Sequence, residues 1–282
     1  MALAWVVMTT PSAVSEAAGA VSPLRDHLVA ARLAGSVATT RENNLDHYAA
    51  MARREPYHLL GLVPSRRWSS ADVLALMVER CGVVADPDHR VGTDTIDPDL
   101  TIAGLDAMGA RLQVAAERRE RVLVATGHPV GLGPTHTAVL QALAAAGCTV
   151  LTPADGWRHP AASDYEQRTG TLGYLDGLGV LLGSHGRPVH THSPLPVQAA
   201  LRALSAAGEP PPDLVVADHG WAGGAGQAGI DAVGFADCND PALFVGEAEG
   251  CIVACVPLDD NVAPHLYAPL TAYLLVRAGL ST

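Results

Sequence analysis

The chain has 282 residues, of which 49% are hydrophobic and 17% charged, a composition typical of a globular protein with a sizeable core. Its formal net charge is -11, and all 18 basic residues are arginine because the sequence contains no lysine. The missing lysine excludes a Walker A phosphate loop, Schiff-base catalysis and a lysine general base. The acidic balance argues against a nucleic-acid partner, which would require a basic surface.

Cysteine usage and hydropathy favour a cytoplasmic protein. The cysteines are odd in number and contain no C-x-x-C pair, which favours reduced thiols. No apolar run reaches the ~18 residues that a bilayer span requires, so we expect no membrane partner. Residues 1–8 are apolar but lack the early positive charge and the cleavage site of a signal peptide. The five cysteines are Cys81, Cys148, Cys238, Cys251 and Cys255.

The N-terminal part of the chain has the pattern of a helical region. Residues 1–22 are expected to form a loose tail. Ser22 and Pro23 are typical of a helix start, and Gly35 of its end. Apolar residues at helical spacing then predict two further helices, at 41–54 and 70–81.

A loop and a fourth helix complete this N-terminal region. Residues 86–101 are dense in Asp, Gly and Pro, and this composition predicts a loop. We expect the next helix to cover 101–119 and Asp99 to cap it. The segment 97–101 also imitates the D-x-D-x-T signature of haloacid-dehalogenase phosphatases. That chemistry needs a buried apolar strand before the first Asp, and the preceding residues do not form one.

From residue 121 the sequence alternates apolar runs with Ala- and Leu-rich helical stretches. Uniformly apolar strands separated by helices predict a mostly parallel sheet that is covered on both faces. We therefore predict an α/β, Rossmann-like three-layer fold, with a helical N-terminal region at 23–120 packed on a core at 121–282. A closing helix is expected over 264–280. The predicted strands are 121–126, 148–153, 171–183, 188–192, 213–218, 231–237 and 251–257.

Polar residues follow several of these strands, and ligands bind beyond the carboxyl ends of the strands in open α/β sheets. After the first strand, a glycine-rich turn at 127–136 leads into a helix whose N-terminus could bind an anion. Gly127 is a candidate to bind substrate, and His128 and His136 could bind phosphate, transfer a proton or ligate a metal. The alternative is a tight strand–helix turn with two capping histidines.

Two later strands end in carboxylates. Asp218 and His219 follow one strand, and Gly223 lies in the glycine-rich segment after them, where backbone could approach a ligand. Asp237, Asn239 and Asp240 follow the next strand. Together with Asp218 they offer the hard oxygen ligands that Mg²⁺ or Mn²⁺ prefers. The alternative is that both groups only cap the helices that follow them.

Two further groups of polar residues follow predicted strands, and each is weaker evidence for a site. His190 and His192 alternate along a predicted strand, so both are expected on one face, where they could contact phosphate or a metal. Residues 259–261, with two aspartates and an asparagine, add polar groups after the last strand or form an ordinary turn. A serine hydrolase is disfavoured because the sequence has no G-x-S-x-G motif.

The sequence resembles a family of bacterial proteins described as phosphatases over about residues 22–280. This resemblance implies phosphatase activity and gives functional weight to the motif positions. It adds Arg41, Asn43 and Asn44, because an arginine at a helix start could bind phosphate through two parallel hydrogen bonds. The motifs that carry the resemblance are RENN (41–44), GTDTIDP (92–98), ATGHP (125–129), HTHSP (190–194), ADHGWAG (217–223), FADCNDPALF (235–244) and VPLDD (256–260).

These observations lead to one mechanistic hypothesis, the hydrolysis of a small phosphomonoester. One or two divalent cations (Mg²⁺ or Mn²⁺) would be held by Asp218, Asp237, Asn239 and Asp240. His128 or His219 would carry a proton to the leaving oxygen. The alternatives are an isomerase or transferase that acts on a phosphorylated nucleotide or sugar, and a non-catalytic sensor of such a metabolite. The substrate and the oligomeric state, including a homo-oligomer, stay open.

Overall fold

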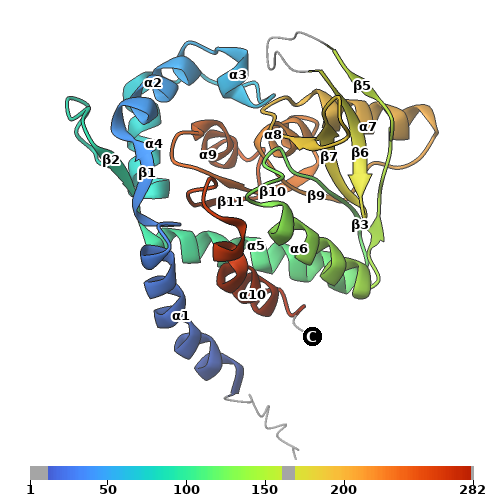
Figure 1. The fold of residues 1–282 in the computed structure, drawn as a ribbon, viewed down its shortest axis with the longest axis horizontal. Coiled ribbons are helices and arrows are strands. Elements are labelled where there is room, and N and C mark those ends of the chain that lie inside the picture. Colours follow the sequence, from blue (N-terminus) through green and yellow to red (C-terminus); the bar gives the residue numbers. More distant parts are fainter. Residues whose placement is uncertain (1–11, 161–168, 281–282) are drawn as a thin grey trace, which may run out of the picture.

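In the computed structural model, the described residues are 12–160 and 169–280. Their central feature is a five-stranded sheet with the order β11-β10-β9-β3-β4, in which every neighbouring pair is parallel (Figure 1). No helix in the described ranges combines the length and the apolar character that a membrane span requires. The five strands are β3 (Arg121–Val124), β4 (Thr149–Val150), β9 (Leu214–Asp218), β10 (Asp231–Ala236) and β11 (Ala254–Pro257).

Counted along the chain, these strands have the order 2-1-3-4-5, so the direction of winding reverses between β3 and β9. In doubly wound sheets, ligands bind beyond the carboxyl ends of the strands at this reversal. Residues 127–128 follow β3, and His219 follows β9. The topology therefore brings the loops after these two strands to the same place.

Helices cover both faces of the parallel sheet, which confirms the predicted α/β three-layer fold (Figure 1). On one face α5 and α6 pack against the strands, and α10 packs on both helices. On the other face α8 and α9 pack against the strands, and α7 packs on α8. The helices are α5 (Pro98–Arg118), α6 (Gly133–Ala145), α7 (Leu195–Ala206), α8 (His219–Gln227), α9 (Pro241–Ala248) and α10 (Ala268–Arg277).

The central strands are apolar along their length because helices bury both of their faces. All five residues of β9 and all four of β11 are buried, and Asp218 is the one charged residue among them. This pattern explains why the sequence predicted these strands correctly. It also makes Asp218 unusual, since a buried carboxylate requires hydrogen-bond partners.

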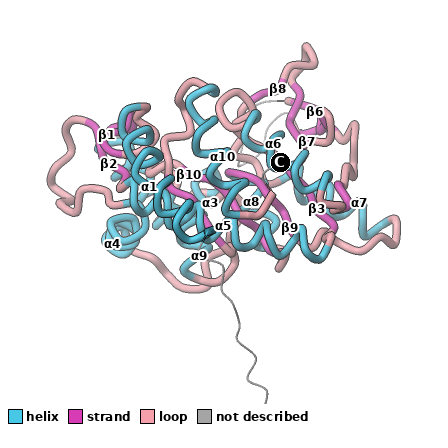
Figure 2. Tube along the Cα trace, turned by 90° about the horizontal axis from the view of Figure 1, so that it is seen from below, coloured by secondary structure: helices cyan, strands magenta, loops and turns pink. Residues whose placement is uncertain are grey.

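Two small antiparallel sheets flank the parallel sheet at opposite ends of the molecule (Figures 1 and 2). One pairs β1 (Gly35–Thr40) with β2 (Thr93–Ile96), so the predicted loop at 86–101 contains a strand. The other has the order β5-β6-β7-β8, and the predicted strand at 171–183 is in fact a hairpin. Its strands are β5 (Arg158–His159), β6 (Gly170–Leu175), β7 (Leu178–Leu182) and β8 (Pro188–Val189).

The hairpin escaped prediction because both of its strands are largely apolar, and only Asp176 and Gly177 interrupt the run. Both residues have positive φ angles, 48° and 93°, as a tight turn requires. His190 and His192 follow β8 rather than lie on a strand. The prediction that these two histidines alternate along a strand is therefore wrong, and their common position has another cause.

The N-terminal helices agree with the sequence in part. α4 (Ser70–Cys81) has the predicted bounds, and Ser69 and Asp72 form a capping box before it. α2 (Arg41–Ala52) ends two residues earlier than expected, and α3 (Pro56–Leu59) follows it. The cap of α5 is Asp97, whose side chain accepts from the Asp99 backbone N–H, so the predicted cap at Asp99 is wrong.

The two ends of the chain also differ from expectation. α1 covers Ser12–Ala30 with Pro23 inside it, so the helix begins well before the predicted start. Alanine is frequent in the part before Pro23, and this composition favours helix. Residues 12–22 of the expected tail are thus helical, and residues 1–11 lie outside the described part. The closing helix is divided into a 3-10 turn, η1 (Pro264–Tyr267), and α10.

Candidate functional site

A cavity of about 750 Å³ lies where the loops after β3, β9, β10 and β11 meet. It also receives residues from β1, α2, α3 and the segment after β8. Among the described residues, its lining contains four aspartates and five histidines but no arginine. The acidic and imidazole side chains are Asp237, Asp240, Asp259, Asp260, His47, His128, His190, His192 and His219.

His219 occupies a sharp turn between β9 and α8. Its φ angle is +46°, a left-handed conformation that is uncommon for a side chain of this size. Asp218 directly before it is fully buried, and its Oδ1 accepts a hydrogen bond from His219 Nδ1 at 2.9 Å. Asp218 also accepts from Thr126 Oγ1 at 2.5 Å and from the Gly127 backbone N–H at 2.6 Å. These bonds orient His219 so that Nε2 faces the cavity.

Close backbone approaches join three of the loops that form the site. A Cβ added at Gly127 would collide with the carbonyl oxygen of Thr191, and one added at Gly220 would collide with that of His192. Thr191 N–H also donates to Gly127 O at 2.9 Å. Gly127, predicted to bind an anion, and Gly220 therefore let the loops after β3, β8 and β9 touch, because any side chain at either position would collide with a backbone carbonyl.

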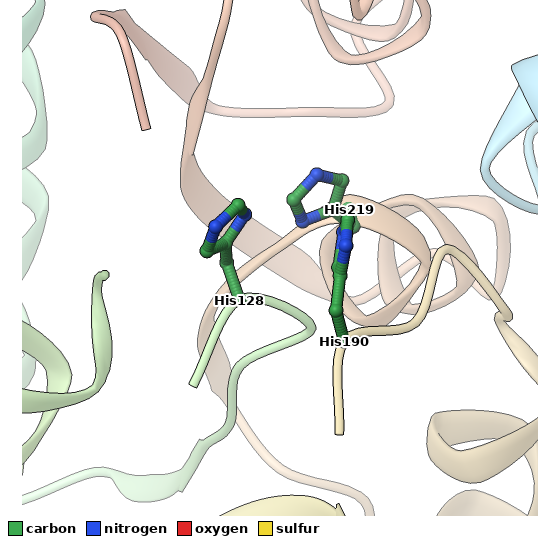
Figure 3. Close-up of side chains that lie close together, drawn as sticks. All are labelled: His128, His190 and His219. Atoms are coloured by element: carbon green, nitrogen blue, oxygen red, sulfur yellow. The ribbon is translucent and has the colours of Figure 1, made fainter. Parts of the chain in front are cut away.

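The loops that these glycines join present three imidazoles to one another (Figure 3). The ring centroids of His128 and His190 are 4.6 Å apart, and those of His190 and His219 are 5.1 Å apart. One nitrogen from each ring lies within 4.8 Å of the others, so the three side chains could hold a metal ion. Three imidazole nitrogens are a common ligand set for zinc and related ions.

Three carboxylates form a second group beside the imidazoles. Asp237, Asp259 and Asp260 each place an oxygen within 4.8 Å of the other two, and all three are buried. Asp237 accepts hydrogen bonds from Thr39 Oγ1 and from the Cys238 backbone N–H. These fixed donors hold the carboxylate in place, and a hard divalent cation would suit the three oxygens.

The last group with metal-ligand character consists of His192, His219 and Asp240. Asp240 Oδ2 is 3.2 Å from His219 Nε2, and Asp240 Oδ1 is 4.0 Å from His192 Nδ1. The ring of Tyr57 stacks on His192, with centroids 4.4 Å apart. His219 belongs to both histidine-containing groups, so an ion bound to it would draw its other ligands from either side.

The pKa values of the histidines in the site are shifted in opposite directions. Burial alone would lower the pKa of His219, but its hydrogen bonds to Asp218 and Asp240 outweigh burial and hold the pKa well above its usual value. Burial, with the nearby His219 and His128, lowers the pKa of His190 to about 4. Burial likewise lowers the pKa of His192 well below its usual value.

The pKa values of the carboxylates in the site are also shifted in opposite directions. Burial raises the pKa of Asp237 well above its usual value, and the charges of Asp260 and Asp259 raise it further. Burial acts in the same direction on Asp240, but the charge of His192 and the hydrogen bond from His219 outweigh it and lower the pKa. A cluster of mutually repelling carboxylates next to histidines is typical of sites that bind cations.

α2 contributes a polar wall opposite the sheet. Thr40 caps this helix, and Asn43 and His47 line the cavity one turn apart. Asn239 Nδ2 donates to Asn43 Oδ1 at 2.8 Å, and His47 Nδ1 donates to the Asn239 carbonyl at 2.9 Å. Asn239 thus joins α2 to the loop after β10 through Nδ2 and its backbone carbonyl, and its predicted role as a metal ligand through Oδ1 stays a prediction.

Arg41, predicted to bind phosphate, does not reach the cavity. Its guanidinium is fully buried, forms an ion pair with Asp94 at 2.8 Å and donates to two backbone carbonyl groups. Asn44 also donates to Asp94, at 2.8 Å, and contacts the Cys238 thiol. Both residues are held inside the domain because burial of a charge requires complete pairing. They anchor α2 and β2 and do not line the cavity.

Several other predicted residues lie beneath the cavity rather than at its surface. His136 is fully buried, with Nδ1 3.1 Å from Leu132 O and Nε2 3.8 Å from Asp218 Oδ2. Gly127 supports the loop, as described above. Gly223 lies within α8, where a Cβ would collide with the carbonyl oxygen of Leu60. Of the predicted site residues, those that line the cavity are His128, His190, His192, His219, Asp237, Asn239, Asp240 and Asn43.

The structure adds residues that the sequence analysis did not select. Thr39, Thr40, His47 and Tyr57 line the cavity from β1, α2 and α3. No strand-end pattern marks them, because they come from the N-terminal region and reach the site only through packing. Asp259, Asp260 and Asn261 had such a pattern and were described only as polar rim residues.

Comparisons with known proteins identify the family of this chain. A family model described as "Phosphatase" matches residues 20–282. A Streptomyces coelicolor protein named "Phosphatase SCO2771" is 51% identical over 260 residues, which cover 91% of this chain and 95% of that protein. The motifs that contribute the cavity lining lie within the matched region. The chain belongs to the family described as Phosphatase.

Proposed function

We propose that this protein hydrolyses a small, polar phosphomonoester with the help of divalent metal. The observation that carries the proposal is the composition of the cavity, in which four aspartates and five histidines converge and no arginine is found among the described lining residues. A phosphate dianion would be repelled from such a cavity unless cations neutralised the carboxylates. Membership of the phosphatase family and the name of the Streptomyces relative support a phosphate-hydrolysing reaction.

The donor atoms suit a divalent cation. Among the described residues, buried site atoms without a hydrogen-bond partner include His128 Nδ1 and Asp260 Oδ2. Buried polar atoms are otherwise nearly always paired, so atoms of this kind that face a common space favour a bound ion. When bound, a divalent cation would polarise the phosphoryl group and lower the pKa of an attacking water.

The chain's own residues would orient the substrate. The N-terminal ends of α2, α8 and α9 border the cavity at Thr40, His219 and Asp240, and helix N-termini favour negative charge. Thr39, Asn43 and Asn261 offer neutral polar groups that suit hydroxyl groups of a leaving alcohol. A volume of about 750 Å³ suits a metabolite of modest size.

Hydrolysis forms a bond from water oxygen to phosphorus, breaks the bond from phosphorus to the ester oxygen, and transfers one proton to the leaving alkoxide. His128 and His219 were predicted to carry this proton, but their positions favour ligation. His192 also lines the cavity, and because its lowered pKa keeps the ring neutral, it would take a proton from the attacking water and pass it to the leaving alkoxide.

The test is release of inorganic phosphate from a panel of phosphomonoesters, with Mg²⁺, Mn²⁺ or Zn²⁺ added to chelator-treated protein. We expect turnover that depends on metal, and Asp240→Asn should lower kcat/KM by roughly two orders of magnitude. Asp176→Asn, in the exposed turn between β6 and β7, is a matched control that should behave as wild type. Rearrangement of a phosphorylated sugar without phosphate release would instead favour an isomerase, and tight binding without turnover a sensor.

A further inference from the structure

The imidazole group and the carboxylate group of the site meet at one side chain, Asp260. Its Oδ2 is 3.5 Å from His219 Nε2 and 3.6 Å from His128 Nδ1. The same carboxylate belongs to the group of Asp237 and Asp259, with oxygens within 4.8 Å of one another. Asp260 thus lies between a set of nitrogen donors and a set of oxygen donors.

Two separations on the nitrogen side, both measured from Asp260, are close to those of ligands around one ion. Four ligands at the zinc bond length of ~2.0–2.1 Å form a tetrahedron whose edges are ~3.3–3.4 Å. The measured distances from Asp260 Oδ2 to His219 and His128 are close to these edges. His190 joins His128 and His219 in a group of three imidazoles whose nitrogens lie within 4.8 Å of one another, and Asp260 lies beside two of these rings.

The oxygen side has a different chemistry. Asp237, Asp259 and Asp260 contribute only carboxylate oxygens, and hard ions such as Mg²⁺ or Mn²⁺ prefer such ligands. Asp259 is oriented by two backbone donors, Ala38 N–H at 3.0 Å and Asn261 N–H at 3.0 Å. These bonds and those to Asp237 hold both carboxylates toward Asp260.

Charge indicates how many ions the site needs. Four buried aspartates face the cavity, and no arginine is among the described residues that line it. The side chain of Asp260 is only 8% exposed, and its Oδ2 has no hydrogen-bond partner among the described residues. A carboxylate oxygen at this depth that accepts no hydrogen bond is costly unless a cation lies beside it. Two divalent ions would balance the four carboxylate charges.

We propose that the site holds two metal ions of unlike chemistry. A nitrogen-rich subsite of His128, His190 and His219 would bind a zinc-like ion, an oxygen-rich subsite of Asp237 and Asp259 a magnesium- or manganese-like ion, and Asp260 would bridge them. In two-metal sites the ions lie ~3.5–4 Å apart, a distance that one bridging carboxylate spans. The inference rests on the proposed function for its purpose, but ion content can be measured without turnover.

The first experiment measures ion content in chelator-treated full-length protein titrated with Co²⁺ and Mn²⁺. We expect saturation at two ions per chain, with intense visible absorption from Co²⁺ in the nitrogen-rich subsite because tetrahedral Co²⁺ absorbs strongly. Mn²⁺ in both subsites should show a magnetically coupled spectrum in electron paramagnetic resonance. Saturation at one ion per chain would overturn the proposal.

The second experiment separates the subsites. His190→Ala should abolish the Co²⁺ absorption and leave the Mn²⁺ affinity of the oxygen-rich subsite within about threefold of wild type. Asp237→Asn should do the reverse, and its amide is isosteric, so the hydrogen bond from Cys238 N–H can persist. Asp260→Asn should lower the affinity of the site for both ions by at least about tenfold. Loss of one and the same ion in His190→Ala and Asp237→Asn would contradict two subsites.

Separate control measurements distinguish loss of folding and loss of activity from loss of metal binding. Circular dichroism and thermal unfolding identify a variant that does not fold, and His128→Gln then replaces His190→Ala as the test of the nitrogen-rich subsite. Asp176→Asn is the matched control for the carboxylate variants. If two ions bind and no phosphomonoester is hydrolysed, the two-ion site stands and the proposed function fails. If one ion suffices for full activity, the two-ion inference fails and the function stands.

Discussion

Asp218 and His219 are neighbours in sequence, but only His219 lines the cavity, and Asp218 lies buried beneath it. Asp218 is fully buried below the floor and accepts from His219 Nδ1 at 2.9 Å, and His219 Nε2 faces Asp240 and Asp260 above it. A carboxylate that holds the far nitrogen of an imidazole fixes its tautomer and orientation. Asp218, predicted as a metal ligand, is thus placed to position His219.

This relationship predicts a specific effect of Asp218→Asn. The variant should fold, because the amide fits the same space, but its affinity for divalent metal should fall by roughly 10–100-fold, since the orientation of His219 is no longer fixed by a charge. Metal titration followed by Co²⁺ absorption measures the effect. Asp176→Asn serves as the control, and unchanged affinity in Asp218→Asn would show that the carboxylate does not position His219.

Metal binding should release a proton. The hydrogen bonds to Asp218 and Asp240 that raise the pKa of His219 favour a protonated ring in metal-free protein, whereas a metal ligand must be deprotonated. We therefore expect metal affinity to rise with pH until the pH passes this pKa. Calorimetric titration at pH 7 in two buffers with different heats of ionisation counts the released protons. Binding without proton release would mean that His219 is already neutral or is not a ligand.

The contact between the loops after β3 and β8 can be tested with one methyl group. Gly127→Ala would push a Cβ against Thr191 O, so we expect a loss of roughly 1–3 kcal/mol in the free energy of unfolding and weaker metal binding. Gly133→Ala is the matched control, because a Cβ at Gly133 meets nothing within 4 Å. Equal behaviour of the two variants would exclude a structural role for the close approach.

The buried ion pair of Arg41 and Asp94 leads to a different prediction. Arg41→Leu should destabilise the protein by about 3–5 kcal/mol, because it leaves Asp94 buried without its cation. KM of the folded enzyme should change little, since Arg41 does not line the cavity. Arg25→Leu, which breaks an exposed pair with Asp99, should cost less than about 1 kcal/mol. A large rise in KM at unchanged stability would instead support phosphate binding by Arg41.

The sequence predicted a helix or strand correctly where the residues of that element alone determine its structure. The strands β3, β9, β10 and β11 were predictable because uniform burial demands continuous apolar runs, and α4 because its cap and spacing agree. Strand-end positions also selected His128, His219, Asp237 and Asp240, since parallel strands place such residues at one edge of the sheet.

Where two segments decide the outcome together, the sequence was not sufficient. A run of apolar residues at 171–183 does not reveal whether it continues or folds back, because both strands of the β6–β7 hairpin are largely apolar. Arg41 illustrates the same limit. Its partner Asp94 is 53 positions away, and no local pattern distinguishes a guanidinium that binds substrate from one that stabilises the interior.

By itself the sequence determined the layered α/β fold and the rim at which polar groups gather, because both follow from local periodicity and the geometry of parallel strands. Only the tertiary structure decided which of those groups face the cavity. It placed Asp218 beneath His219, brought Tyr57 and His47 in from the N-terminal helices, and put Asp260 between imidazoles and carboxylates. The physical reason is that burial, pairing and distance between remote side chains are properties of packing, which a linear pattern does not contain.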